Sequence, residues 1–213
     1  MCKVKVCGIT DVGILPVLNA LTPDYAGFIL TSGFKRSVSE EFASAARKTL
    51  CGAVKTVGVF VNDDPKRIAG LVKAGIVDLI QLHGDEDGEY IRIIKASCSA
   101  PIIKSVHVTD GKVSPYPDNC DFVLLDAYSP HMRGGTGKRI EWRRYEEIKK
   151  PVFLAGGITP DNVKDALAAV QPYCVDCSGG VETDGIKDAG KIEKYIKNVR
   201  EFEKYGKQKG QIR

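Results

Sequence analysis

The sequence predicts a single-domain α/β fold in which eight parallel strands close into a barrel. Short runs of β-branched and apolar residues recur along the 213 residues, and amphipathic stretches with helical spacing separate most of them. No Gly-x-Gly-x-x-Gly motif follows the first run, and an open doubly wound sheet rarely needs eight units of equal size. A closed (β/α)8 barrel, which begins at about 200 residues, therefore fits both the pattern and the length.

Local signals place the elements along the chain. Ser39 and Asp64 stand where helix N-caps are expected, and a proline at position 65 suits a first helical turn. The segment after the fifth strand, TDGKVSPYPDNC, holds too much Pro and Gly for a normal helix, so this connection should be short or irregular. The barrel domain should span 1–205, followed by a frayed basic tail over 206–213. The predicted strands are 3–7, 24–30, 55–61, 77–82, 101–108, 121–126, 151–156 and 173–178. The predicted helices are 11–21, 88–96, 159–170 and 188–204, with two more beginning after Ser39 and Asp64.

Composition narrows the class of protein. With 43% hydrophobic and 27% charged residues, the chain can build a full core, so disorder is excluded. The net charge of +4 is spread along the chain without a basic block, which disfavours a nucleic-acid partner. No window approaches the roughly 18 apolar residues of a membrane span, so no membrane partner is expected.

The cysteines indicate a reducing compartment. Their number, seven, is odd, and no apolar signal segment precedes them, so we expect free thiols and a cytoplasmic protein. Cys174 and Cys177 form a Cys-x-x-Cys pair, but the pair lies in a predicted strand, where positions i and i+3 point to opposite faces. No metal site is therefore expected.

Barrel enzymes carry their chemistry at the carboxyl ends of the strands. The first strand ends in Cys7, and alternation places Lys5 and Cys7 on one face and Val4 and Val6 on the other. If the valines pack under the helices, Lys5 and Cys7 point into the barrel. A thiol there could act as a general base, because a nearby ammonium would lower its pKa. A buried structural cysteine remains the simpler interpretation of this spacing alone.

The sixth strand ends in Asp126. Phe122 and Leu124 share its face, so the carboxyl group should emerge at the rim after two apolar residues. Such a carboxyl group could serve as a general acid. It could equally cap the next segment or pair with Lys5 for structural reasons.

Two glycine-rich turns follow the last two strands. One contains Gly156 and Gly157 and the other contains Ser178 and Gly179, and both places match the usual phosphate site of barrel enzymes. The loop after the sixth strand holds a further glycine cluster around Gly135, which could act as a lid or cradle a phosphate. Phosphate binding is favoured over a purely structural role for these glycines, because two glycine-rich turns occur at the places where barrel enzymes bind phosphate.

Three more polar side chains stand at the rim. Arg36 follows the second strand and could hold a carboxylate with a two-pronged hydrogen bond, although a solvated loop charge is the commoner case. Gln81 and His83 end the fourth strand on a shared face. His83 could carry a proton, but a hydrogen-bonded wall residue is the simpler interpretation.

Taken together, these segments resemble the phosphoribosylanthranilate isomerases of tryptophan biosynthesis. The matching stretches occur in the family's order and cover nearly the whole chain. They are KVCGIT (5–10), FKRSVS (34–39), VGVFVN (57–62), IQLHGDE (80–86), LLDA (124–127), GGTGK (134–138), LAGGITPDNV (154–163) and DCSGGVE (176–182).

The resemblance implies a TIM barrel that needs no metal or organic cofactor. It implies an Amadori rearrangement of N-(5-phosphoribosyl)anthranilate, a phosphorylated small molecule, by a monomer or homodimer. In the family's pattern Cys7 is the catalytic base, Asp126 is the general acid and Arg36 holds the anthranilate carboxylate. The other substrate-binding residues expected on this basis are Gln81, His83, Gly135, Gly156, Gly157, Asp176, Ser178 and Gly179.

The last motif departs from the family. Cys177 and Gly179 stand where the family usually has valine and serine, so the phosphate contact there should rest on backbone N–H groups. Two alternatives stay open. One is a related sugar-phosphate isomerase of histidine biosynthesis, although that class resembles two fused halves and carries an aspartate where this chain has Cys7. The other is a barrel that binds a phosphometabolite without catalysis.

Overall fold

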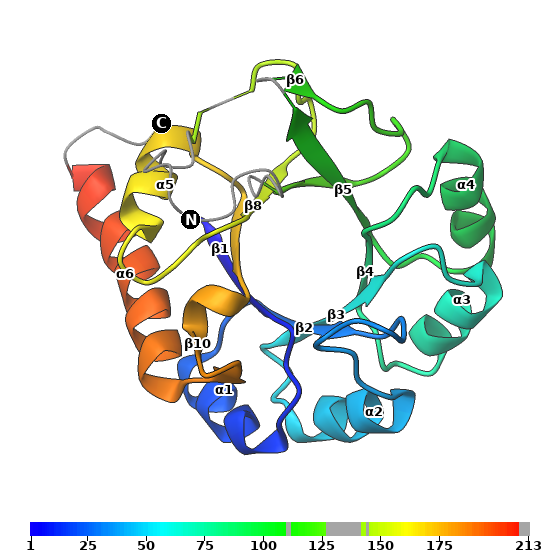
Figure 1. Cartoon of the computed structure of the whole chain (residues 1–213), viewed down its shortest axis with the longest axis horizontal. Helices are drawn as coiled ribbons and strands as arrows, with labels where there is room; N and C mark the ends of the chain where they lie inside the picture. Colours follow the sequence, from blue (N-terminus) through cyan, green and yellow to red (C-terminus); the bar gives the residue numbers. More distant parts are fainter. Residues whose placement is uncertain (110–111, 127–141, 144, 209–213) are drawn as a thin grey trace.

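Eight parallel strands form a closed barrel in the computed structural model, which describes residues 1–109, 112–126, 142–143 and 145–208 (Figure 1). The hydrogen-bonded order is β4-β3-β2-β1-β9-β8-β7-β5, and pairing between β4 and β5 closes the ring. The predicted (β/α)8 barrel is thereby confirmed. Its strands are β1 (Lys3–Cys7), β2 (Tyr25–Ile29), β3 (Lys55–Phe60), β4 (Leu79–Leu82), β5 (Ile102–Thr109), β7 (Phe122–Asp126), β8 (Val152–Ala155) and β9 (Cys174–Cys177).

Helices surround the barrel, as Figure 1 shows. The expected caps are confirmed: the side chain of Ser39 accepts a hydrogen bond from the backbone N–H of Phe42, and that of Asp64 accepts one from Lys66. The first predicted helix is divided, with a 3-10 turn at Val12–Ile14 before α1. The helices are α1 (Leu15–Leu21), α2 (Glu40–Thr49), α3 (Pro65–Lys73), α4 (Gly88–Ser97), α5 (Val163–Val170) and α6 (Ala189–Gln208).

Some connections differ from the expected pattern. After β5 the described residues contain a short strand, β6 (Lys112–Val113), which pairs antiparallel with the end of β5, in keeping with the irregular connection predicted there. The helix predicted from residue 159 was placed too early. Thr159 and Asn162 exchange side-chain hydrogen bonds with each other's backbone N–H groups in a turn, and α5 begins only afterwards.

The segment after β9 was also not foreseen. A 3-10 turn at Gly179–Val181 leads into a hairpin of β10 (Glu182–Thr183) and β11 (Ile186–Lys187). This hairpin precedes α6 and places the charged side chains of Glu182 and Lys187 near the end of the barrel.

Strand alternation separates two cores. Val4 and Val6 belong to the large core between strands and helices, as predicted. A smaller core lies inside the barrel, where Cys174 is found, whereas Cys177 belongs to the outer core. The two thiols therefore point to opposite faces, as the strand spacing predicts. Among the described residues, no group of three or more His, Cys, Asp or Glu side chains could hold a metal ion.

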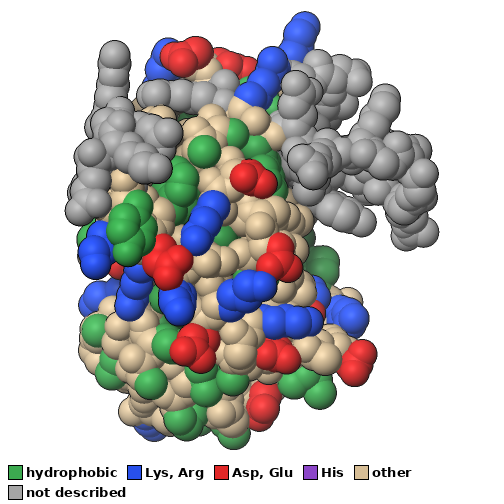
Figure 2. Space-filling view, turned by 90° about the vertical axis from the view of Figure 1, so that its left-hand side faces the viewer, with side chains coloured by type: hydrophobic (Ala, Val, Ile, Leu, Met, Phe, Trp, Pro, Cys, Tyr) green, Lys and Arg blue, Asp and Glu red, His purple; other side chains and the backbone are tan. Residues whose placement is uncertain are grey.

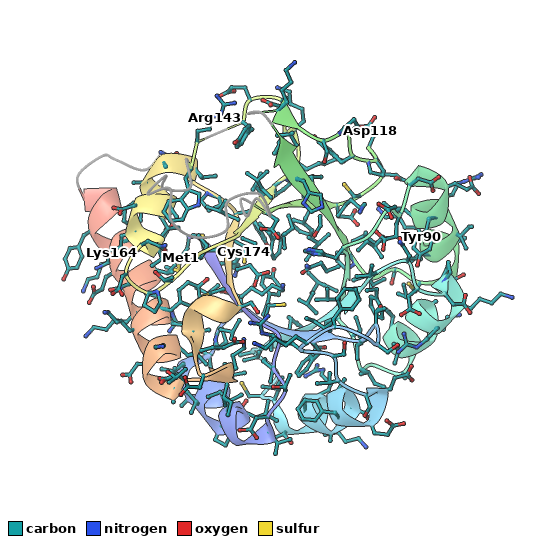
Figure 3. The ribbon with its side chains drawn as sticks, viewed as in Figure 1. Met1, Tyr90, Asp118, Arg143, Lys164 and Cys174 are labelled. Carbon is teal, nitrogen blue, oxygen red and sulfur yellow. The ribbon has the colours of Figure 1, made fainter. Side chains whose placement is uncertain are left out.

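The inner core is aromatic at the amino-terminal ends of the strands. The rings of Tyr25, Phe122 and Tyr173 lie 5.5, 5.4 and 5.6 Å from that of Phe153, measured between centroids. Figure 3 shows side chains filling the interior. Because this end of the barrel is plugged by rings, polar groups inside the barrel gather toward the carboxyl ends of the strands.

Outside the barrel, charged side chains of both signs are interspersed on the face shown in Figure 2. Among the described residues, no helix has the length and apolarity that crossing a membrane requires. The boundary between a domain over 1–205 and a frayed tail over 206–213 stays a prediction.

Phe153→Ala should destabilise the fold by about 3–5 kcal/mol, because the ring is fully buried and its loss leaves a cavity inside the barrel. Urea unfolding followed by circular dichroism measures the change. Phe34→Ala is the matched control, since Phe34 is exposed and its loss should change the free energy of unfolding by under about 0.5 kcal/mol. Equal effects of the two substitutions would contradict the importance of the aromatic plug.

Candidate active site

The two proposed catalytic side chains lie at the same end of the barrel. Cys7 is the last residue of β1 and Asp126 is the last residue of β7, and β8 and β9 lie between these strands. Cys7 is buried, and Asp126 is half-buried. The structure therefore brings a thiol and a carboxyl group to the rim where barrel enzymes carry their chemistry.

Room for the thiol comes from a glycine on the neighbouring strand. Gly27 of β2 pairs with Cys7, and a Cβ atom added there would lie 2.6 Å from Cys7 Sγ. A larger residue would push the thiol out of its place. Gly27 was not singled out from the sequence, although a glycine inside a strand is a known sign of close approach.

Beneath the thiol, a charged pair is fully enclosed in the barrel. Lys5 Nζ donates hydrogen bonds to Asp176 Oδ2 at 2.6 Å and to Gln81 Oε1 at 2.7 Å. Burial opposes the charge on Lys5, but the carboxylate of Asp176 and the thiol of Cys7 outweigh it and raise the pKa of the ammonium. Lys5 therefore stays charged inside the barrel.

Burial and the ammonium of Lys5 have opposite effects on the pKa of the thiol. Burial raises the pKa of Cys7 above its ordinary value, and the carboxylate of Asp176 adds to the rise, whereas Lys5 lowers it. The expectation that Lys5 favours the thiolate is right in direction. Its influence is outweighed by the cost of burying a negative charge.

His83 connects this pair to Asp126. Its Nδ1 atom lies 3.0 Å from Gln81 Nε2 and 2.7 Å from the hydroxyl of Ser105, and its Nε2 atom lies 4.0 Å from Asp126 Oδ2. Burial lowers the pKa of His83, so the imidazole is neutral near neutral pH. Ser105 was missed, although it follows the inward-facing Ile103 by two residues on β5 and so shares its face.

Arg36 is held from one side by an ion pair. Its Nε and Nη2 atoms donate to the two carboxylate oxygens of Glu182, both at 2.7 Å, and Glu182 also accepts from Lys187 at 2.5 Å. Burial opposes the charge on Glu182, but the hydrogen bonds from Arg36 and Lys187 lower its pKa below the ordinary value. Glu182 comes from the hairpin that the sequence did not predict, and its role was missed for that reason.

The glycine-rich turns after β8 and β9 lie against each other. A Cβ atom on Gly180 would lie 1.9 Å from the carbonyl oxygen of Ile158, so the two backbones touch. Gly156 and Gly157 adopt φ angles of 84° and 66°, which favour glycine. Ser178 and Gly179 follow β9 beside Arg36, because a Cβ atom on Gly179 would lie 3.4 Å from Arg36 Nη2.

The remaining predicted site residues lie either inside the barrel or outside the described residues. Gln81 and Asp176 lie inside the barrel on Lys5, where both are almost completely buried. Gly135 lies outside the described residues.

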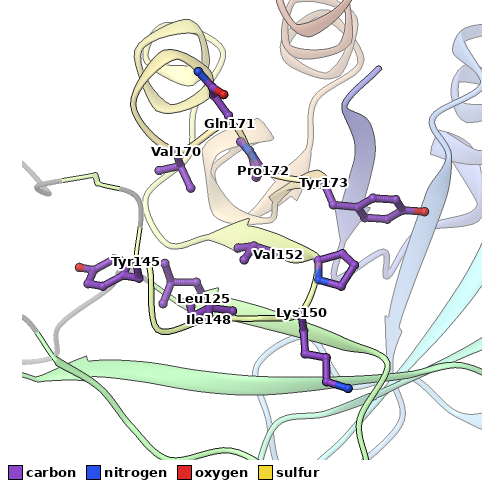
Figure 4. A pocket seen from close by; sticks show the side chains of 10 residues that line it. Leu125, Tyr145, Ile148, Lys150, Val152, Val170, Gln171, Pro172 and Tyr173 are labelled. Atoms are coloured by element: carbon purple, nitrogen blue, oxygen red, sulfur yellow. The ribbon is translucent and has the colours of Figure 1, made fainter. Parts of the chain in front are cut away.

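A separate pocket lies between β8 and the start of β9, and Figure 4 shows Val152, Val170 and Tyr173 among its lining side chains. It contains none of the predicted site residues.

The closed barrel and the polar cluster at its carboxyl end define an α/β-barrel enzyme with its site at the strand ends. Within that class, the chain belongs to the N-(5'-phosphoribosyl)anthranilate (PRA) isomerase family, whose model matches residues 4–198. The N-(5'-phosphoribosyl)anthranilate isomerase of Endomicrobium trichonymphae is 41% identical over 200 residues, which cover 94% of this chain and 99% of the relative.

Solved structures agree with this assignment. The phosphoribosyl anthranilate isomerase of Thermotoga maritima is 32% identical, with a TM-score of 0.80 over 94% of this chain and 100% of that one. A second isomerase structure, in complex with reduced 1-(o-carboxyphenylamino)-1-deoxyribulose 5-phosphate, is 29% identical, with a TM-score of 0.76 and the same coverage of both chains.

Lys5→Met should shift the pH profile of Cys7 alkylation upward, because the ammonium that favours the thiolate is lost. Peptide mass spectrometry after timed iodoacetamide labelling reads Cys7 separately from the other thiols. Lys3→Met is the matched control, since Lys3 pairs with Asp24 instead and its loss should leave the profile unchanged.

An unshifted profile in folded Lys5→Met protein would reject this influence on Cys7. The substitution leaves Asp176 buried without its cation, which can cost about 3–5 kcal/mol, so folding is checked by circular dichroism. Asp176→Asn provides the reverse test: removing the carboxylate should shift the profile downward.

Proposed function

We propose that the chain converts N-(5'-phosphoribosyl)anthranilate to 1-(o-carboxyphenylamino)-1-deoxyribulose 5-phosphate, an Amadori rearrangement in tryptophan biosynthesis. The observation that carries the proposal is that a thiol and a carboxyl group, Cys7 and Asp126, end β1 and β7 at the same end of the barrel, which also holds two touching glycine-rich turns. The reaction needs an acid and a base acting on different atoms of one phosphorylated sugar. Membership of the family supports this choice of substrate.

Asp126 and Cys7 divide the proton transfers. Asp126 donates its proton to the ring oxygen of the ribose while the anthranilate nitrogen pushes the ring open, leaving a carboxylate and an iminium ion. The iminium makes the proton on C2 acidic, and the Cys7 thiolate removes it. The resulting enolamine tautomerises to the ketone. Lys5 stabilises the thiolate from below, which offsets part of the cost of burying it.

The substrate is held by two groups of contacts on the rim and by one acceptor inside the barrel. Backbone N–H groups of Gly156, Gly157, Ser178 and Gly179 bind the phosphate, with Gly135 of the loop after β7 as a further contact. Arg36, fixed by Glu182, receives the anthranilate carboxylate. Asp176 Oδ1 is buried and has no hydrogen-bond partner among the described residues, which makes it an acceptor for a sugar hydroxyl.

Gln81 and His83 form the wall of the site beside the sugar. The chain acts on this phosphorylated small molecule as a monomer or homodimer.

The decay of phosphoribosylanthranilate fluorescence on adding purified protein tests the proposal directly. Cys7→Ala and Asp126→Asn should each lower kcat by about 10²–10⁴-fold, the range for one positioned acid or base, while a phosphate-bearing product analogue still binds. Cys51→Ala is the control, because Cys51 lies away from the barrel end between α2 and β3. Near-normal turnover in either site variant would remove that residue from its role.

Arg36→Ala should raise KM for the substrate about tenfold to a hundredfold, the loss expected for a charged hydrogen-bonded pair. The effect on kcat should be smaller, since Arg36 holds the ring carboxylate rather than the reacting atoms. Arg47→Ala is the matched control, because Arg47 faces Asp78 at 3.6 Å outside the site. An unchanged KM for Arg36→Ala would argue against carboxylate binding by Arg36.

A further inference from the structure

A chain of hydrogen bonds runs through the barrel from Lys5 to His83. Lys5 Nζ lies 2.7 Å from Gln81 Oε1, and Gln81 Nε2 lies 3.0 Å from His83 Nδ1. At the far side of the ring, His83 Nε2 lies 4.0 Å from Asp126 Oδ2. The charged group beneath Cys7 is therefore linked, through one amide and one imidazole, to the carboxyl group assigned as the acid.

Only one arrangement of donors and acceptors fits the hydrogen bonds from Lys5 through Gln81 to His83. A lysine ammonium has three donors and no acceptor, so Gln81 must turn its carbonyl oxygen toward Lys5. The amide nitrogen of Gln81 then faces His83, and this nitrogen can only donate. His83 Nδ1 must accept that hydrogen bond, so the single proton of the neutral ring lies on Nε2.

Ser105 is compatible with this arrangement but does not determine it. Its hydroxyl lies 2.7 Å from His83 Nδ1 and can donate or accept a hydrogen bond. A hydroxyl would accommodate either form of the ring. The amide of Gln81, oriented by Lys5, is the group that distinguishes the two forms.

We infer that Lys5 and Gln81 are positioning residues that hold His83 in its Nε2–H form, so that an N–H group rather than a nitrogen lone pair faces Asp126. This inference rests on the proposed function, in which Asp126 is the acid. In the Nδ1–H form, the ring would turn the lone pair of an unprotonated nitrogen toward Asp126 and oppose the negative charge that remains there after proton transfer. In the Nε2–H form, it turns an N–H dipole toward the carboxyl group instead.

The distance between the ring and the carboxyl group fits such a role. At 4.0 Å the contact is too long for a hydrogen bond, so the N–H dipole acts on Asp126 by electrostatics alone. The same dipole favours the carboxylate that remains after Asp126 has given its proton to the sugar. The Nε2–H tautomer of His83 therefore assists the proton transfer by stabilising the charge that it leaves on Asp126.

Nitrogen-15 NMR of the ligand-free wild-type protein tests the inference, and a substitution at the site is needed only to assign the signals. The chain has three histidines, and the signals that disappear in His83→Asn belong to His83. We expect His83 Nδ1 to resonate in the unprotonated range and Nε2 in the protonated range at neutral pH. A protonated Nδ1 in the wild-type protein would overturn the inference.

Gln81→Glu and Ser105→Ala form a matched pair of variants. A carboxylate at position 81 can only accept, so it should draw the proton to His83 Nδ1, and kcat should fall roughly tenfold to a hundredfold while KM changes less. Ser105→Ala should leave Nδ1 unprotonated. Folded Gln81→Glu protein with Nδ1 still unprotonated would contradict the role of Gln81, as would a protonated Nδ1 in Ser105→Ala.

These readouts separate the inference from the proposed function. Wild-type protein that holds His83 in the Nε2–H form but does not turn over phosphoribosylanthranilate would reject the proposed function. Protein that turns it over with Nδ1 protonated would reject the positioning role alone. If Gln81→Glu does not fold, the wild-type spectrum and Ser105→Ala still decide the matter.

Discussion

The ammonium of Lys5 is the charge around which the interior of this barrel is organised. It is completely enclosed, and a buried charge without partners would cost several kcal/mol. Hydrogen bonds to Asp176 of β9 and Gln81 of β4 offset that cost, so the Lys5 side chain joins three strands, β1, β4 and β9. Because Lys5 also lies beneath Cys7, the interaction that stabilises the interior is the same one that bears on the thiol.

The two ends of the barrel have opposite chemistry, and this decides where a site can form. At the amino-terminal ends of the strands, rings such as Phe153 and Tyr25 pack into an apolar plug. Toward the carboxyl ends, the inward positions carry Lys5, Gln81 and Asp176. Successive inward residues on one strand are about 6.5 Å apart, so a few positions separate a sealed floor from a reactive rim.

Most of the barrel could be predicted from the sequence because its strands obey a period of two. That period placed Lys5 and Cys7 inside and Val4 outside, and it divided Cys174 from Cys177. The same argument could have found Ser105. It could not have found the pairing of Arg36 with Glu182, because that contact joins a loop to a short hairpin, and the alternation of the barrel strands constrains neither.

The start of α5 also could not be predicted from the sequence. Thr159-Pro160-Asp161 has the composition of a helix start, but Thr159 and Asn162 satisfy each other's backbone groups in a turn. Residues with short polar side chains support both outcomes, and the surrounding fold chooses between them. The role of Glu182 depends on such a choice too, since it follows a 3-10 turn that leads directly into a hairpin.

The charges around the glycine-rich turns explain why this side of the rim suits an anion. Arg36 and Lys187 share the single carboxylate of Glu182, so the cluster keeps one net positive charge, whereas Lys5 and Asp176 cancel each other. Gly8, with a φ angle of 74°, lets the stem of Arg36 cross the end of β1, where a Cβ atom would lie 2.6 Å from Arg36 Cδ. Gly179 contributes no side-chain donor to this region and leaves its charge unchanged. In the proposed function, the attraction of an anionic substrate to this rim depends on a surplus cation held in place by the carboxylate of Glu182, more than on any one side chain of the turns.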